Sequence, residues 1–218
     1  MRKGKVKKSG EFPGDAEQQM RDKGVPDWYI ESCRKIAYLF PKAHAVAYVM
    51  MAFRIAWFKV HKPLAFYSAY FYRRSQKGGF DAQLMCGGTD DVRRHINEMK
   101  KRDLSANEED LLVTLEAVYE FNMRGFEFAP IDLYQSEATR FTIVGDNQLR
   151  PPFVSIPGLG ETAAWDLAHC KELGREFISI EEVGAACPKV SQTHLETLKA
   201  LGALGDMPDT NQLNLFEL

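Results

Sequence analysis

The sequence lacks the motifs by which a self-contained enzyme is usually recognised. It contains no Gly-x-x-x-x-Gly-Lys loop, no Gly-x-Ser-x-Gly elbow and no paired histidines at metal-ligand spacing. It also has no Asp-x-Asp pair on a candidate strand, whereas two-metal phosphoryl transfer needs carboxylates that hold two ions about 4 Å apart. We therefore expect no catalytic residue, no metal site and no cofactor in this chain.

Cysteine is scarce and dispersed. The four cysteines form no Cys-x-x-Cys pair, so neither a zinc site nor a disulfide framework is indicated. They are Cys33, Cys86, Cys170 and Cys187. Dispersed cysteines favour a reducing compartment, and we expect a cytoplasmic protein.

Long apolar runs are scarce too. The residues before Trp28 contain no apolar run, so we expect no secretory signal. Residues 43–60 form the only candidate in the sequence for a membrane span. Arg54 lies inside that run and Lys59 and His61 lie at its end, which argues against a spanning helix. The sequence therefore predicts no membrane partner.

Charge is unevenly distributed along the chain. Residues 1–77 hold 16 of the 28 Lys and Arg but only 6 of the 30 Asp and Glu, so this part carries +10 and the remainder −12. A basic front part predicts attraction to a polyanion, of which nucleic acid is the commonest. The acidic remainder argues against one continuous DNA-coating surface, so contact there should be local.

The most apolar stretch is residues 38–63. Apolar side chains fall on every side of a 3.6-residue period, which predicts a core helix buried on most of its circumference. Pro41 suits the first helical position, yet Lys42 and His44 follow without an acid to complement the helix dipole. Cations at a helix start suit an arriving phosphate. The alternative is that Lys42 is solvated and His44 is a satisfied core histidine.

Periodic segments elsewhere predict further helices. They span about residues 15–23, 28–38, 64–74, 90–102 and 107–124, with two more between residues 179 and 204. In the segment 28–38 we expect four side chains to face the core: Trp28, Ile30, Cys33 and Ala37. The aromatic run within 64–74 fits core packing better than the stacking of unpaired bases.

A small β element is predicted after these helices. Residues 126–134 and 140–144 alternate apolar and polar side chains, which is typical of a short β-hairpin or meander joined by a polar turn at 135–137. The predicted fold class is therefore mainly α with a small β element (α+β).

A glycine-containing loop precedes the helix expected after residue 160. The residues are Ile156, Pro157, Gly158, Leu159 and Gly160, with Thr162 in the first helical turn. They resemble a helix-hairpin-helix, in which glycines bring bare N–H groups at a helix start against a phosphate without reading any base. The alternatives are a plain turn and, because Glu161 follows directly, a loop poorly suited to phosphate.

Several segments together resemble a known family. They are residues 28–36 (WYIESCRKI), 40–45 (FPKAHA), 54–55 (RI) and 59–63 (KVHKP). These segments resemble the fingers region of bacterial replicative DNA polymerase III alpha subunits, most closely the PolC type of low-GC Gram-positive bacteria. The resemblance covers nearly the whole chain and implies the C-terminal portion of such a polymerase, with the palm and its Mg²⁺ upstream. This portion alone should not polymerise DNA.

The resemblance implies four functional parts. Residues 1–88 would be a fingers portion that binds template and incoming nucleotide (dNTP), 89–152 a helical and β connector, 153–206 a helix-hairpin-helix module that holds duplex DNA, and 207–218 a tail. Residues 184–188 depart from the usual linker of the module and leave open whether its second half touches DNA. The candidates for nucleotide or DNA phosphate contact are Lys35, Lys42, His44, Arg54 and Lys59.

The tail carries the last candidate site. Gln212, Leu213, Leu215 and Phe216 resemble the short peptide with which bacterial polymerases hold the sliding clamp. Two large apolar side chains near a chain end suit insertion into a hydrophobic groove.

Two rival functions remain at this point. The chain could be a stand-alone, non-catalytic DNA-binding adaptor that links duplex DNA to the sliding clamp, or a helical structural protein without a nucleic-acid partner. Salt-dependent binding to duplex DNA would separate the second rival from the others.

Overall fold

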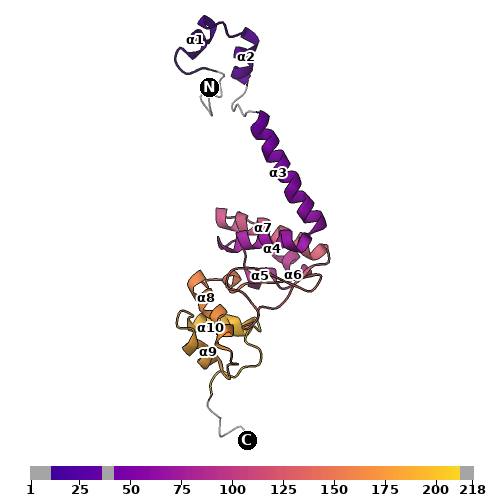
Figure 1. Ribbon diagram of the computed structural model, residues 1–218, viewed down its shortest axis with the longest axis vertical. Helices are drawn as coiled ribbons and strands as arrows, with labels where there is room; N and C mark the ends of the chain where they lie inside the picture. The colour runs from indigo at the N-terminus through magenta and orange to yellow at the C-terminus, as the bar shows by residue number, and fades with distance from the viewer. Residues whose placement is uncertain (1–10, 36–41, 212–218) are drawn as a thin grey trace. The chain divides into compact units, whose positions relative to one another are not determined.

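The computed structural model describes residues 11–35 and 42–211 (Figure 1). The chain forms two compact units. The first is Met1–Ala56 and the second is Trp57–Leu218. The functional boundaries predicted near residues 88 and 152 both fall within the second unit. One cluster of buried side chains runs across both positions, so they do not separate the packed core. The two boundaries remain predictions about function.

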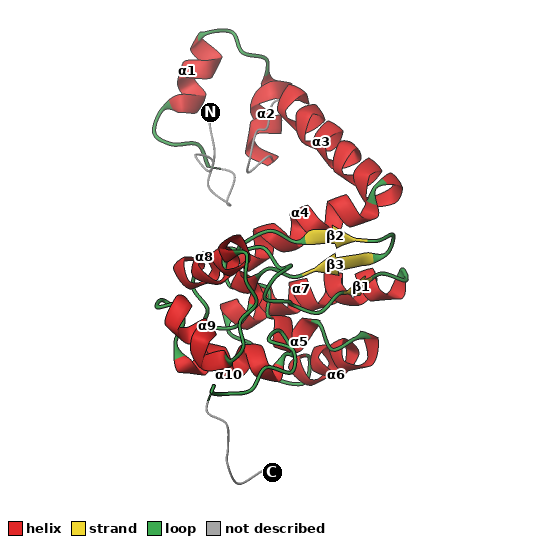
Figure 2. Cartoon of the chain, turned by 60° about the horizontal axis from the view of Figure 1, so that its bottom comes forward, coloured by secondary structure: helices red, strands yellow, loops and turns green. Residues whose placement is uncertain are grey.

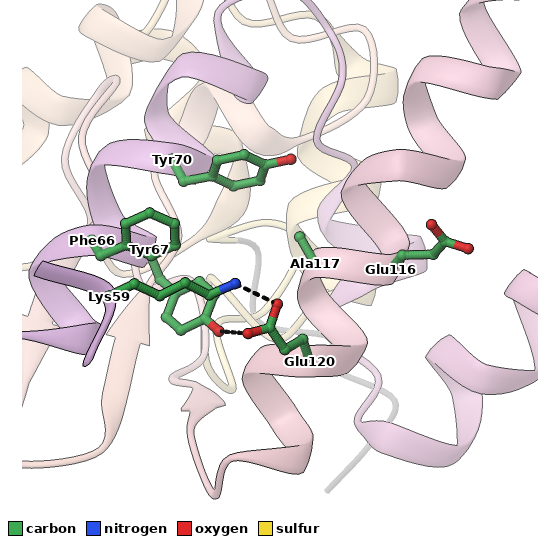
Figure 3. A pocket seen from close by; sticks show the side chains of 7 residues that line it. All are labelled: Lys59, Phe66, Tyr67, Tyr70, Glu116, Ala117 and Glu120. Carbon is green, nitrogen blue, oxygen red and sulfur yellow. Dashed lines mark hydrogen bonds and ion pairs between the residues drawn. The ribbon is translucent and has the colours of Figure 1, made fainter. Parts of the chain in front are cut away.

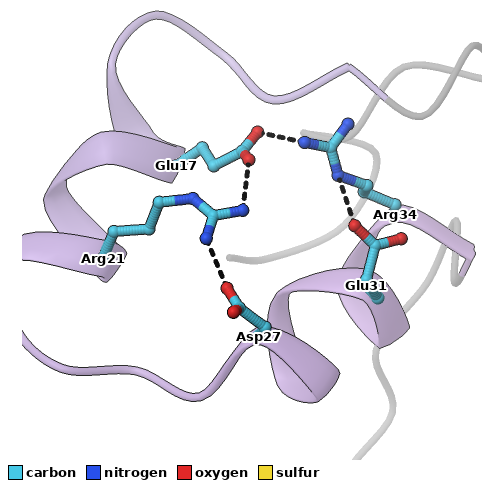
Figure 4. A network of polar contacts seen from close by, with 5 residues as sticks. All are labelled: Glu17, Arg21, Asp27, Glu31 and Arg34. Atoms are coloured by element: carbon cyan, nitrogen blue, oxygen red, sulfur yellow. Dashed lines mark hydrogen bonds and ion pairs between the residues drawn. The ribbon is translucent and has the colours of Figure 1, made fainter.

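The first unit begins with two short helices, α1 (Ala16–Asp22) and α2 (Asp27–Lys35). A network of charged side chains joins them (Figure 4). Glu17 accepts hydrogen bonds from Arg34 (2.5 Å) and Arg21 (3.1 Å), and Arg21 also bridges to Asp27 at the start of α2. The guanidinium of Arg34, followed by that of Arg21, holds the pKa of the Glu17 carboxyl below its usual value.

The predicted core face of α2 is only partly correct. Ile30 and Cys33 are buried, whereas Trp28 is 70% exposed. A helix turns about 100° per residue, so Trp28 lies about 200° around the helix from Ile30. The helix therefore presents Ile30 and Cys33 to one face and Trp28 to the other. Ala37 lies outside the described residues.

Helix α3 (Lys42–His61) forms as predicted, but the expectation of a core helix is wrong for this chain. None of its 20 described residues is buried; Phe53 is 74% exposed and Tyr48 is 67% exposed. The apolar composition predicts that the side chains favour burial, but burial on every side requires packing partners around the whole helix. The described residues do not supply them.

By length and composition, α3 is also the one helix of the described ranges that could cross a membrane. Buried helices of soluble proteins meet the same criterion, so composition alone does not distinguish the two settings. Arg54 remains the residue that argues against a span.

The second unit packs its first four helices around aromatic side chains. These helices are α4 (Pro63–Ser75), α5 (Ala82–Met85), α6 (Thr89–Met99) and α7 (Ala106–Met123). Tyr67 and Phe71 of α4 are buried against Phe121 of α7, with ring centroids 5.0 and 5.7 Å from it, so the aromatic run serves the core. Helix α7 begins at a capping box in which Ser105 and Glu108 bond each other's backbone.

The small sheet differs from the predicted hairpin. Its strands are β1 (Glu127–Phe128), β2 (Thr142–Val144) and β3 (Gln148–Arg150), in the order β1-β3-β2 (Figure 2). The hairpin joins β2 to β3 through a turn that starts at Gly145 (φ +62°), while β1 pairs parallel to β3. Residues 129–141 form a loop instead of strand and turn, because Asp132 accepts the backbone N–H groups of Tyr134 and Gln135.

The chain ends in short helices that continue the same core. They are the 3₁₀ helix η1 (Phe153–Ser155), α8 (Glu161–His169), the 3₁₀ helix η2 (Cys170–Leu173), α9 (Ile180–Ala186) and α10 (Gln192–Ala200). One cluster of buried side chains runs from Tyr67 to Leu204. The fold class is thus confirmed as mainly helical with a small three-stranded sheet.

Candidate nucleic-acid interface

The first hairpin of the C-terminal helices is built by residues 156–160. Ile156 and Leu159 are 1% and 3% exposed, and Leu159 N–H donates to the carbonyl of Ile156 (3.1 Å), which closes a tight turn. Gly158 has φ +77°, which is typical of a type II turn with Pro157 at the preceding position. The turn delivers the chain to Gly160, the N-cap of α8.

This first hairpin leaves the backbone N–H groups of Gly158 and Gly160 available. Among the hydrogen bonds of the described residues, none uses the N–H of Gly158 or Gly160. Glu161 and Thr162 follow in the first turn of α8, whose N–H groups have no acceptor within a helix, and Gly160 offers no side chain to cap them. The indole N–H of Trp165 lies 3.4 Å from Glu161 Oε1, on the helical turn that follows. An anion can therefore approach bare N–H groups at a positive helix end.

A second hairpin with a related sequence was not singled out from the sequence. Residues 187–191 read Cys, Pro, Lys, Val, Ser, and Val190 N–H donates to the carbonyl of Cys187 (2.9 Å), as in the first hairpin. Ser191 caps α10 with φ −76° and ψ 161°, close to the −69° and 162° of Gly160. The shared pattern, apolar-Pro-x-apolar-x before a helix, was the signal that could have revealed the repeat.

The second hairpin has its backbone N–H groups already paired. Lys189 N–H donates to Asp166 Oδ2 (2.9 Å), and Ser191 N–H donates to His194 Nδ1 (3.4 Å). Ser191 Oγ in turn accepts from His194 N–H (3.3 Å), which completes a capping box. A carboxylate and a capped helix start thus occupy the positions that are open in the first hairpin.

His194 connects the two hairpins. Because its Nδ1 accepts from Ser191 N–H, its Nε2 is the ring nitrogen that carries a proton, and Nε2 lies 3.1 Å from the carbonyl oxygen of Gly158. The start of α10 thereby supports the turn of the first hairpin.

A cavity of about 440 Å³ adjoins the first hairpin. Residues 156–161 line one side of it, and Gln76 and Asp81 belong to the opposite segment. Burial raises the pKa of Asp81, whose Oδ1 caps α5 by accepting from Gln83 N–H (2.8 Å). The cavity therefore lies between the turn after α4 and the hairpin.

Four of the five predicted cationic residues lie in the first unit, and Lys59 lies in the second. Lys42, His44 and Arg54 lie on α3 and are exposed, as is Lys35 at the end of α2. His44 packs edge-on against Tyr48, with ring centroids 4.6 Å apart. At 1.5 Å per residue, Arg54 lies about 18 Å along the helix from Lys42, so the two cannot hold the same phosphate group. How Lys42 and the hairpin at Gly158 face a common DNA path remains a prediction, because they belong to different units.

Lys59 takes part in a network inside the second unit (Figure 3). Its Nζ lies 2.7 Å from Glu120 Oε2, and Tyr67 OH donates to Glu120 Oε1 (3.0 Å). Arg124, which was not among the predicted phosphate contacts, donates to Tyr67 OH (3.2 Å) and to the carbonyl of Lys59 (3.0 Å) near the C-terminal end of α3. Burial opposes the charge of Glu120, but the hydrogen bonds from Lys59 and Tyr67 keep its pKa below the usual value. This arrangement gives Lys59 a structural partner.

The predicted clamp-binding residues Gln212, Leu213, Leu215 and Phe216 lie outside the described residues. The segment just before them is anchored to the start of α9. The carbonyls of Pro208 and Asp209 accept the N–H groups of Ile180 (2.9 Å) and Glu181 (3.0 Å), and Lys199 Nζ binds Asp209 Oδ1 (2.5 Å).

Comparison with known proteins identifies the hairpin region. Residues 125–213 match the family model of the helix-hairpin-helix motif. Over 213 residues, the chain is 46% identical to a DNA polymerase III PolC-type of Bacillus cereus. This match covers 97% of this chain and 14% of that protein. The corresponding proteins of Streptococcus thermophilus and Thermotoga maritima are 49% identical over 204 residues and 44% identical over 212 residues. These two matches cover 92% and 97% of this chain and 14% and 15% of the respective proteins.

The chain is therefore homologous to a segment of PolC-type DNA polymerase III. It spans about a seventh of the length of these relatives. The sequence resemblance to PolC is confirmed at this level, and so is the helix-hairpin-helix motif.

Proposed function

We propose that this chain is part of a PolC-type replicative DNA polymerase and that its first hairpin, residues 156–160, holds duplex DNA by a backbone phosphate. The observation that carries the proposal is that, among the described residues, the N–H groups of Gly158 and Gly160 have no hydrogen-bond acceptor and no side chain caps the helix that begins there. Backbone N–H groups read no base, so the grip is independent of sequence. A replicative polymerase needs such a grip, because it travels over every sequence.

The same proposal assigns the exposed cations of the first unit to template or incoming nucleotide. Lys42 and His44 start an apolar helix without any acid in its first turn, and Arg54 lies further along it. Lys35 ends the preceding helix, whereas Lys59 is the weakest candidate because Glu120 neutralises it. In the full-length polymerase, replacing Lys42 and His44 by Ala should raise the KM for dNTP; an unchanged KM and kcat would remove both residues from this role.

The apolar surface of α3 supports membership of a larger protein. Its side chains favour burial on every side, and the relatives are about seven times longer than this chain. We assign the covering surface to the remainder of the polymerase, which would also carry the catalytic Mg²⁺ ions.

The sliding clamp is the second proposed partner. Pro208 and Asp209 fix the backbone three residues before Gln212, so a clamp-binding peptide at 212–216 would start from a fixed point on α9. Deleting residues 212–218 should abolish clamp binding while duplex binding persists. Clamp affinity that survives the deletion would assign the contact elsewhere.

Gly160→Asp tests the hairpin directly. A Cβ at Gly160 meets no atom within 4 Å, and its φ and ψ match those of Ser105 and Ser191, so an aspartate there should cap α8 and preserve the fold. Its carboxylate would occupy the N–H groups and repel phosphate. We expect duplex affinity, measured by fluorescence anisotropy at several salt concentrations, to fall about 10- to 100-fold.

Ser105→Asp is the matched control. It makes the same change in net charge at the N-cap of α7, where φ is −69° and ψ is 161°. Its duplex affinity should stay within about twofold of the unaltered chain. Equal losses in the two variants would show that net charge, and not the first hairpin, governs binding.

A further inference from the structure

Two buried thiols are in contact beside the second hairpin. Cys170 begins η2 and Cys187 follows α9, and their Sγ atoms lie 2.9 Å apart although the residues are 17 positions apart in sequence. Both are almost fully buried, at 1% and 0% exposure. The spacing of the four cysteines along the chain did not indicate this pair.

The thiol pair connects the end of α8 to the second hairpin. The Sγ atoms of Cys170 and Cys187 lie 3.8 and 3.6 Å from the carbonyl oxygen of Asp166, and the carboxylate of Asp166 accepts the N–H of Lys189. The hairpin and tail residues proposed above to contact DNA and the clamp do not include these thiols. The other two cysteines are Cys33 in α2 and Cys86 after α5. Neither has a thiol partner in the described ranges.

We propose that Cys170 and Cys187 are a modification site at which a hydroperoxide converts the two thiols into an intramolecular disulfide. The disulfide would join the end of α8 to the second hairpin and hold that hairpin in its paired, capped conformation.

With hydrogen peroxide as the hydroperoxide, one molecule balances the reaction. The Cys170 thiol gives up its proton, and the thiolate attacks one peroxide oxygen. The O–O bond breaks, a sulfenic acid forms, and the departing hydroxide takes the released proton and becomes the first water. The Cys187 sulfur then attacks the sulfenic sulfur, the S–S bond forms, the S–O bond breaks, and the departing hydroxide takes the thiol proton as a second water. The two thiols together lose two electrons and two protons, and the peroxide is reduced to two waters.

The surroundings favour Cys170 as the attacking thiol. The hydrogen bond from Cys187 lowers the pKa of Cys170, whereas the same pairing, together with burial, raises the pKa of Cys187. Residues 172–176, which follow Cys170, are exposed, so a local opening of η2 gives a small oxidant access. The second thiol is already in contact and can resolve the sulfenic acid before further oxidation.

The test uses the reduced full chain in which Cys33 and Cys86 are replaced by Ser, with hydrogen peroxide as the probe. We expect the oxidised chain to lose about 2 Da. Trypsin cleaves after Lys171 and Arg175, so Cys170 and Cys187 lie on separate peptides. Without reductant these two peptides should be found joined by a disulfide. Closing a loop of this length should raise Tm by roughly 5–10 °C, and dithiothreitol should reverse the shift. Adding Cys187→Ser should remove both the cross-link and the shift.

Three outcomes would overturn the proposal. The first is a gain of about 16 or 32 Da at Cys170 without a cross-link, which would show irreversible or unresolved oxidation. The second is a protein that remains fully reduced while folded. The third is a cross-link between separate chains. If the Cys187→Ser variant does not fold, the peptide cross-link in the Cys33→Ser, Cys86→Ser chain still decides the question by itself.

Discussion

The two hairpins have related sequences and similar closing bonds, yet they differ in what their backbone can bind. In the first, Gly158 adopts φ +77° and the N–H groups at positions 158 and 160 are unpaired. In the second, Lys189 stands at the position of Gly158. Its φ is not positive, because no non-glycine residue among those described has a positive φ. The chain therefore turns differently there, and the N–H of Lys189 donates to Asp166. A hairpin therefore becomes an anion site when its N–H groups are unpaired and suitably oriented, and the turn alone is not sufficient.

The largest expected effect concerns the packing that both hairpins need. Ile156 is 1% exposed beneath the first turn, and Ile156→Ala should lower the free energy of unfolding of the second unit by about 2–5 kcal/mol, because it leaves a cavity. Urea denaturation measures the loss. Ile178→Ala is the matched control, since Ile178 is 65% exposed and its loss should stay within about 0.5 kcal/mol. Similar losses at the two sites would contradict the buried role of Ile156.

Gly158→Ala should have the next largest effect and separates backbone strain from DNA contact. An L side chain at φ +77° costs about 1–2 kcal/mol or flips the turn toward that of the second hairpin, so duplex affinity should fall several-fold. Gly145→Ala imposes the same kind of strain at φ +62° in the β2–β3 turn, also without a steric clash. Unfolding and anisotropy should show similar stability losses, with an affinity loss only at Gly158.

His194→Ala should have a smaller effect, through positioning. Removing the ring leaves the carbonyl of Gly158 and the N–H of Ser191 without their partners, which costs about 1 kcal/mol and loosens the first turn. Duplex affinity should fall about threefold, and His194→Gln should restore part of it by offering an amide donor. A loss of stability without any loss of affinity would limit His194 to capping α10.

Much of the second unit was predictable because its signals are local. The helix expected at residues 107–124 forms as α7, which begins at the capping box of Ser105 and Glu108, and the glycines around Leu159 predicted the turn before α8. The strand pairing was not predictable in the same way. The segment 126–134 has the alternation of a strand, but β1 pairs with β3 about 20 residues away. The side chain of Asp132 accepts the N–H groups of Tyr134 and Gln135, which makes a turn where the strand was expected to continue.

The candidate site shows a similar division. The sequence identified Ile156 to Gly160 from glycine and proline spacing, which are local features. It did not identify the pairing of Lys189 with Asp166 or of Lys59 with Glu120, because these contacts join residues 23 and 61 positions apart. The prediction that α3 is buried failed for a related reason. The hydrophobicity of 20 residues predicts that a helix needs packing partners, but it does not identify the chain segment that provides them.

Asp166→Asn should give the smallest effect and addresses the second hairpin alone. The amide oxygen of Asn can still accept the N–H of Lys189, so the fold should persist while one negative charge beside the hairpin disappears. Duplex affinity should rise by about twofold at low salt and return to the unaltered value near 0.5 M salt, because screening removes the repulsion. Asp146→Asn, with the same charge change in the exposed β2–β3 turn, is the control. An increase of tenfold or more would mean that the second hairpin also holds phosphate once its carboxylate is neutral, and the distinction between an open and a closed hairpin would then rest on Asp166 rather than on Gly158.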